Sequence, residues 1–314
     1  MTIGNQKSNG RREGSGSAYV YAFGAVLCWS TVASAFKLTL GELRVVPMLA
    51  FASAASSLSL LLLLALRRGR ILSADWNRRS VMRSAVSGFI NPFLYYIVLF
   101  SAYDRLPAQE AQPLNYTWPI VLTLLSALVF HQRVAAAEYA AMGVSFAGVV
   151  ILSTRGKIAE LQVTDPLGVT LALGSSVVWA TYWVLTMRSG HDPVETLFLN
   201  MLFGMVFAFL LALVVGWGRV SIAGVAGAVY IGVFEMGVTF VLWLSALRRA
   251  VTTARVANLV FVSPFFSLIV IHVVVGEPIY PSTAVGLILV VGGLLLQQVV
   301  RQRSSQRTES KTVS

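Results

Sequence analysis

The chain has 314 residues, of which 56% are apolar and 12% are charged, and its formal net charge is +11. The charged fraction is about half of the roughly 25% that is usual for a soluble domain. This composition excludes an ordinary soluble protein, a disordered tail and a secreted disulfide scaffold. The first question is therefore where the 24 Lys and Arg residues lie.

Long apolar runs account for almost the whole chain. A helix needs about 20 predominantly apolar residues to cross the bilayer core. Ten runs of this kind follow one another with short loops between them, at residues 19–38, 44–66, 81–103, 108–130, 134–153, 166–187, 193–216, 221–247, 250–273 and 279–300. The sequence therefore predicts an all-α polytopic membrane protein with ten transmembrane helices and no soluble domain.

The distribution of basic residues indicates the orientation of these spans. If the N-terminus is cytoplasmic, 18 basic residues fall on the cytoplasmic side and 6 on the outside. Because cytoplasmic loops carry the excess of Lys and Arg, we expect both termini in the cytoplasm, which requires an even number of spans. A basic chain can also bind nucleic acid. We expect no such partner here, because the aromatic residues lie inside the apolar runs.

An internal repeat divides the chain into two halves. Matching residues recur in one order, roughly 144 to 150 positions apart: Gly24 and Trp29 with Gly174 and Trp179, Asn91 with Glu235, Pro119 with Pro264, and Gly148 with Gly293. The halves are predicted at 1–158, with a short tail at 1–18, and at 159–314, with a tail at 301–314. Five spans in each half give the halves opposite orientations, which is the inverted repeat of many secondary transporters. Channels and membrane enzymes can also be duplicated.

Glu235 is the one ionisable residue well inside a predicted span. A carboxylate near the bilayer centre costs several kcal/mol unless it is solvated, paired or protonated. It could therefore bind an ammonium group or exchange a proton. Alternatively, it could be a protonated acid bonded to a neighbouring helix, for instance near Asn91.

The start of the fourth span, 108–130, is dense in polar and aromatic residues. Asn115 and Trp118 share a helix face, and Pro113 and Pro119 free backbone carbonyls that need protein or water partners at this depth. We favour a cavity wall over an interfacial aromatic belt, because the asparagine and prolines add nothing to a belt.

Other spans carry aromatic and polar residues on shared faces. Trp179, Tyr182 and Trp183 form a stripe in the sixth span, although such stripes more often serve packing, and Asn91 lies four residues before Tyr95 in the third. A cavity built from such residues suits a small amphipathic solute that stacks on rings. The predicted substrate-binding residues are Asn91, Tyr95, Asn115, Tyr116, Trp118, Trp179, Trp183, Glu235 and Trp243.

The whole pattern resembles a known family. Ten spans in two halves, a Gly-x4-Trp pattern in spans 1 and 6 and Gly276-Glu277 before span 10 resemble the EamA-type drug/metabolite transporter superfamily over about 19–300. The segments 115–119 (Asn-Tyr-Thr-Trp-Pro) and 179–182 (Trp-Ala-Thr-Tyr) are more narrowly similar to the bacterial aromatic amino acid exporters of the YddG type. The first half has Gln132-Arg133 where the second has Gly-Glu, so that signature occurs once.

The resemblance implies a bacterial inner-membrane exporter of aromatic and other neutral amino acids, with Tyr116, Trp118 and Trp179 at its aromatic cavity positions. We expect alternating access, a monomer embedded in the lipid bilayer, and no enzymatic activity, cofactor or metal. One alternative is a multidrug, metabolite or nucleotide-sugar transporter of the same fold, although no Lys or Arg lies mid-span to meet phosphates. The others are a membrane-embedded enzyme, for which a catalytic constellation is missing, and a channel, for which charged rings are missing.

Overall fold

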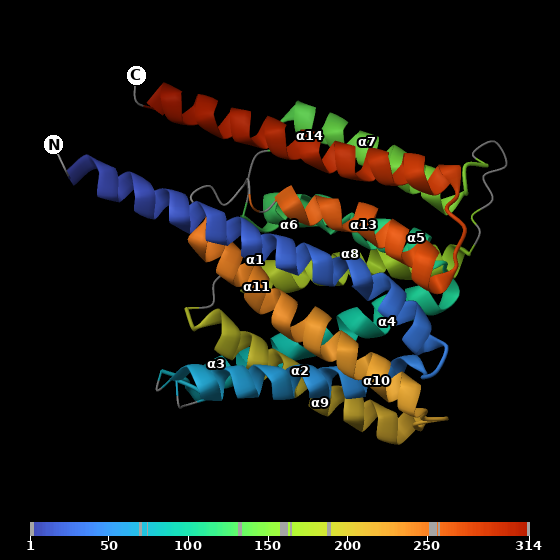
Figure 1. Cartoon of the computed structure of the whole chain (residues 1–314). Helices are drawn as coiled ribbons and strands as arrows, with labels where there is room; N and C mark the ends of the chain where they lie inside the picture. Colours follow the sequence, from blue (N-terminus) through green and yellow to red (C-terminus); the bar gives the residue numbers. More distant parts are fainter. Residues whose placement is uncertain are drawn as a thin grey trace. The chain divides into compact units, whose positions relative to one another are not determined.

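The computed structural model describes the backbone of residues 3–312 except 69–70, 74, 131–133, 158–162, 164, 187–189, 251–255 and 257. All regular elements in this part of the chain are helical (Figure 1). The predicted boundary between the halves, at 158/159, lies outside the described residues, as does the Gln132-Arg133 pair.

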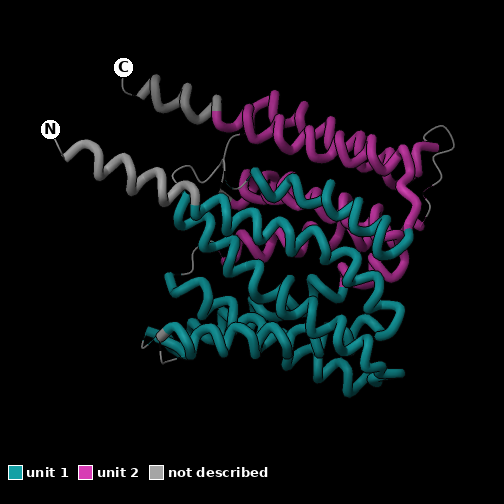
Figure 2. The backbone as a smooth tube through the Cα atoms, in the orientation of Figure 1, with its two compact units in different colours: residues 1–97, 189–276 teal, residues 98–188, 277–314 magenta. Residues whose placement is uncertain are grey.

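The helices form two compact units that are interleaved along the chain (Figure 2). Unit 1 comprises residues 1–97 and 189–276, and unit 2 comprises residues 98–188 and 277–314. Unit 1 contains α1 (Ile3–Leu40), α2 (Val45–Arg68), α3 (Arg78–Gly88), the π-helix η1 (Phe89–Leu94), α9 (Pro193–Val215), α10 (Ile222–Tyr230), the π-helix η3 (Ile231–Val238), α11 (Thr239–Arg249), the 3₁₀ helix η4 (Asn258–Val262), α13 (Ser263–Val270) and the π-helix η5 (Ile271–Val275). Helix α4 (Tyr95–Arg105) starts in unit 1 and continues in unit 2, which also contains α5 (Ala108–Asn115), α6 (Trp118–Phe130), α7 (Ala136–Ser153), α8 (Pro166–Thr186) and α14 (Pro281–Thr312).

Nine helical segments in the described residues are long and apolar enough to cross a membrane. They correspond to nine of the ten predicted spans. The remaining prediction, 108–130, coincides with α5 and α6, which are separated by a break at Tyr116 and Thr117. Because each piece is shorter than a span, this segment is not among the nine.

Polar residues in the loops begin several of these helices. The Asn77 side chain accepts a hydrogen bond from the Ser80 backbone at the start of α3. Asp192 caps α9 in the same way, directly before Pro193 at the first helical position. Ser221 caps α10. Such caps satisfy backbone N–H groups that have no partner inside the helix, so they determine the residue at which each helix begins.

In unit 1 the helices approach one another closely at glycines. Helix α2 lies beside α9, and α1 beside α11 and α13. A Cβ added to Gly88 at the end of α3 would stand 2.5 Å from the carbonyl oxygen of Asn200 in α9. Gly204, one turn further along α9, faces Pro92 of η1. Small residues let helix backbones meet in this way and gain close van der Waals packing.

In unit 2 the same principle joins α7 to α14, which run side by side (Figure 1). A Cβ on Gly148 would stand 2.6 Å from the carbonyl oxygen of Gly286, and one on Gly293 would stand 2.7 Å from that of Ala141. The Ser145 hydroxyl also donates to the carbonyl of Val290 at 2.9 Å. Gly148 and Gly293, which the repeat pattern matches, thus both lie in this single interface.

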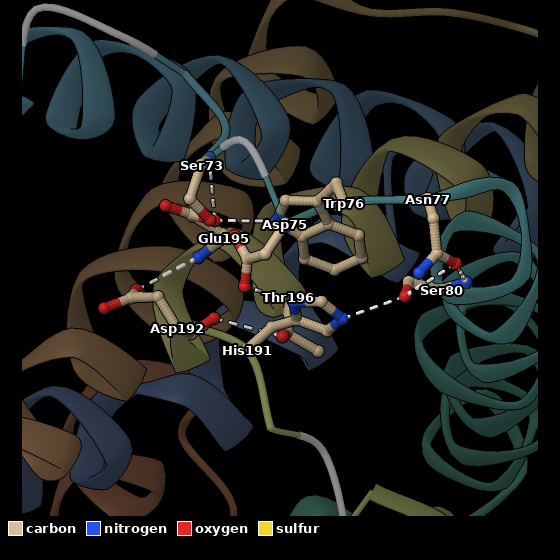
Figure 3. Close-up of polar contacts among 9 residues, drawn as sticks. All are labelled: Ser73, Asp75, Trp76, Asn77, Ser80, His191, Asp192, Glu195 and Thr196. Atoms are coloured by element: carbon tan, nitrogen blue, oxygen red, sulfur yellow. Dashed lines mark hydrogen bonds and ion pairs between the residues drawn. The ribbon is translucent and has the colours of Figure 1, made fainter.

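A buried carboxylate ties the loop after α2 to the start of α9 in unit 1 (Figure 3). Glu195 Oε2 accepts hydrogen bonds from the Ser73 backbone at 3.2 Å, the Ser73 hydroxyl at 2.7 Å and the Trp76 indole at 2.7 Å. The His191 ring stacks on Trp76 with 4.1 Å between ring centroids, and its Nδ1 lies 3.1 Å from Asp75. We call these five residues the Glu195 cluster.

Candidate functional site

The predicted substrate-binding residues are divided between the two units. Both sets lie in helical segments or at breaks within them. Unit 1 contains Asn91, Tyr95, Glu235 and Trp243, and unit 2 contains Asn115, Tyr116, Trp118, Trp179 and Trp183.

Asn91 and Glu235, which the repeat pattern matches, both lie in π-helical segments. Asn91 is in η1, where its backbone is extended (φ −144°, ψ 117°) and interrupts the helix between α3 and α4. Glu235 is in η3, between α10 and α11. A π-helical turn inside an α-helix frequently marks a functional site, because it leaves backbone groups out of the regular hydrogen-bond ladder. The two matched spans therefore share an irregularity at the position of their polar residue.

The Asn91 amide is fully buried, and neither its oxygen nor its nitrogen has a hydrogen-bond partner among the described residues. A buried polar group without a partner costs about 1–3 kcal/mol. The amide could accept from and donate to a bound solute or water.

Only one of the two carboxylate oxygens of Glu235 has a hydrogen-bond donor among the described groups. Its Oε1 accepts a hydrogen bond from the Tyr96 hydroxyl at 3.1 Å, while Oε2 is buried and has no hydrogen-bond partner among the described groups. The Trp29 side chain also interacts with the carboxylate. No ion pair in the described part of the chain involves Glu235.

The two aromatic partners of this carboxylate, Tyr96 and Trp29, pack against further rings within unit 1. Trp29 packs edge-on against Trp243 at 5.3 Å and Phe240 at 6.3 Å between ring centroids. Tyr96 packs edge-on against Phe36 at 6.4 Å. We call Trp29, Phe36, Tyr96, Phe240 and Trp243 the aromatic cluster.

In unit 2, Asn115 closes α5 just before the helix break. Its amide nitrogen donates to the Ser175 hydroxyl of α8 at 2.8 Å. Thr117, inside the break, bonds both the carbonyl of Leu114 and the Ser176 hydroxyl. These contacts hold the irregular backbone against α8. Tyr116 lies in the same break, and Trp118 begins α6 directly after it.

The aromatic stripe of the sixth span is present in α8. Trp179 stacks on Tyr182 at 5.8 Å with an interplanar angle of 30°, and it meets Trp183 edge-on at 6.0 Å. The Trp183 indole nitrogen is buried without a hydrogen-bond partner among the described residues. The rings therefore pack on one another, and one of them retains an unused donor.

Two residues of the Glu235 site were missing from the predicted set. Trp29 enters the sequence analysis only through the repeat pattern, and the predicted set contains Tyr95, four residues after Asn91, but not the adjacent Tyr96. The four-residue spacing holds for a regular α-helix, whereas η1 interrupts it, and Tyr96 is the residue that reaches Glu235. Pro92 was the sequence signal for this interruption, and it left either of the adjacent tyrosines able to face the site.

Among the described residues, no group of three or more His, Cys, Asp or Glu side chains could hold a metal ion.

Comparison with known proteins identifies the family. The EamA-like transporter family matches this chain twice, over residues 16–154 and 166–297. The chain belongs to this family. It is a multi-pass membrane protein of a family named for transport, whose substrates are small molecules.

Curated relatives include amino acid exporters at low identity. A probable terminal-alkyne amino-acid exporter of Streptantibioticus cattleyicolor is 27% identical over 238 residues, 74% of this chain and 78% of the relative. The aromatic amino acid exporter YddG of Ancylobacter novellus is 26% identical over 294 residues, 91% of this chain and 99% of the relative. A solved crystal structure is similar with a TM-score of 0.66 and 24% identity, covering 92% of this chain and 99% of the other, and it supports the fold.

Proposed function

We propose that this chain exports aromatic and other neutral amino acids from the bacterial cytoplasm across the inner membrane. The observation that carries the proposal is Glu235, a half-satisfied carboxylate among aromatic rings in the middle of a span. A polar group at this depth that lacks protein partners is expected to meet a solute or water. Two relatives named as amino acid exporters support the choice of solute.

The mechanism proposed is alternating access by two inverted halves, 1–158 and 159–314, acting as a monomer. It requires ten spans, including the broken 108–130, with both termini cytoplasmic. Two pairings support it: α2 lies beside α9, and α7 beside α14. These are spans 2 and 7 and spans 5 and 10, the corresponding members of the two halves, which an inverted repeat is expected to bring together.

The proposed substrate site combines stacking and polar residues. Tyr116, Trp118 and Trp179 stack the solute side chain, with Tyr95, Trp183 and Trp243 completing the aromatic wall. Asn91, Asn115 and Glu235 meet the polar head. Rings of this kind contribute about 1 kcal/mol per stacked pair beyond their burial.

The test is efflux of labelled phenylalanine from proteoliposomes with and without a pH gradient. We expect flux in the wild type and at least a tenfold fall in Trp179→Ala and Tyr116→Ala. Trp217→Ala is the matched control, since Trp217 packs on Phe51 and Phe209 outside the proposed site. Full flux in both site variants contradicts the site, and no flux of any amino acid by the wild type contradicts the function.

A further inference from the structure

The Glu235 carboxylate has no compensating charge in the part of the chain that the structure describes. Its partners, the Tyr96 hydroxyl and the Trp29 side chain, are neutral. None of the described ion pairs includes it, and Oε2 has no hydrogen-bond donor among the described groups. A desolvated carboxylate of this kind attracts a cation far more strongly than an exposed one, because solvent screens it less.

The neutral Tyr96 donor on one oxygen also orients the other. With Oε1 held at 3.1 Å by Tyr96, the carboxylate cannot rotate freely, and Oε2 stays available as an acceptor. The contrast with Glu110 in unit 2 is informative. There the carboxylate is paired with Arg155 at 2.6 Å, so its charge is already compensated.

The aromatic cluster also favours a positively charged ligand. Indole and phenol ring faces carry negative quadrupole density and attract ammonium groups. Trp29 and Trp243 meet edge-on, so the two rings do not cover each other face to face. Apolar rings around a single anionic acceptor are poorly suited to an anionic ligand, which would meet an uncompensated charge of its own sign.

We propose that Glu235, positioned by Tyr96 and Trp29 and flanked by Trp243, is a subsite for a primary ammonium group of the transported solute. A primary ammonium has three N–H donors and one positive charge, so it satisfies Oε2 and neutralises the carboxylate. The inference rests on the proposed function and deepens it, because it assigns the amine end of the amino acid. It restricts the solutes to compounds that carry an amine and excludes des-amino acids and phosphate esters.

The test is direct binding of 2-phenylethylamine, an amine without a carboxylate, to the purified full chain in detergent by titration calorimetry. We expect the wild type to bind it and not to bind 3-phenylpropionate. Glu235→Gln should weaken amine binding about tenfold or more, since it replaces a charge-assisted hydrogen bond by a weaker neutral one. Glu235→Asp keeps the charge and should retain part of the affinity. Glu138→Gln, which removes a carboxylate from the start of α7, should bind like the wild type.

The outcomes separate this inference from the proposed function. If Glu235→Gln binds the amine as the wild type does, the subsite is wrong, even where phenylalanine efflux persists. If that variant loses only the pH dependence of efflux, the carboxylate carries a proton, and the inference is again overturned. If the amine binds through Glu235 and no amino acid is transported, the subsite stands and the proposed solute is wrong.

Discussion

Two carboxylates in unit 1 have opposite surroundings. Glu195 is 1% exposed, and its Oε2 accepts three hydrogen bonds from Ser73 and Trp76 (Figure 3). Glu235 accepts one hydrogen bond from Tyr96 and interacts with the Trp29 side chain, and its Oε2 has no donor within hydrogen-bond distance among the described groups. The first carboxylate is satisfied by the protein and holds a loop to a helix. Within the described residues, the second carboxylate still has an oxygen free to accept a hydrogen bond, as a group that binds a ligand must have.

The largest expected effect is on stability, in Glu195→Ala. Removing this acceptor leaves the Ser73 amide and hydroxyl and the Trp76 indole without their partner. The expected loss is about 3 kcal/mol in the free energy of unfolding. Chemical unfolding in detergent, followed by circular dichroism, measures it, and an unchanged unfolding free energy would show that the Glu195 cluster is not structural.

Glu235→Leu extends the comparison, because the expected change in the free energy of unfolding has the opposite sign to that of Glu195→Ala. Replacing a half-satisfied carboxylate inside a span by an apolar side chain should stabilise the fold by about 2 kcal/mol, while transport is lost. The same unfolding assay, paired with phenylalanine efflux, checks this. A large loss of stability would instead place Glu235 among the structural acids.

Trp76→Phe tests one of the donors to Glu195. Phenylalanine keeps an aromatic ring to stack on His191 but lacks the indole N–H. We expect a loss of about 1 kcal/mol in the free energy of unfolding and no change in efflux per folded molecule. Trp217→Phe serves as a tryptophan control away from the cluster.

Asp165 is a partly exposed carboxylate in unit 2, and its substitution should give the smallest effect. The Gly168 backbone N–H and the Arg105 guanidinium hold the pKa of the Asp165 carboxyl below its usual 3.8. A lowered folded-state pKa stabilises the fold above the unfolded pKa, and this contribution disappears as the pH falls through the folded pKa. Asp165→Asn should therefore lower the unfolding temperature slightly at pH 7. The difference from the wild type should vanish at a pH well below 3.8, and a difference that persists there contradicts the assignment.

Much of the helical architecture could be predicted from apolar run length. The runs 44–66 and 193–216 correspond closely to α2 and α9, because length and hydropathy alone decide whether a segment can span a bilayer. The family could be predicted from the repeat and the short motifs. The orientation, the halves and the substrate site stay predictions.

The irregular segments could not be predicted in the same way, because packing against other helices determines them. In η3, Gly232 faces the carbonyl of Ala52 in α2, and the Ser56 hydroxyl donates to the carbonyl of Met236 at 3.0 Å. That bond joins η3 to α2 across 180 positions of the sequence, so no local sequence pattern predicts it. The Glu195 cluster is similar, since more than a hundred residues separate Trp76 from His191 and no periodicity brings them together.

The most direct test of the central claim is to measure amine binding and unfolding on the same preparations of Glu235→Gln and Glu195→Gln. These two substitutions remove the same charge and keep almost the same shape. The account predicts that Glu235→Gln loses affinity for 2-phenylethylamine and keeps the unfolding free energy of the wild type. Glu195→Gln should lose unfolding free energy and bind the amine as the wild type does. Equal losses of stability in both variants, with amine binding unchanged in Glu235→Gln, would contradict it.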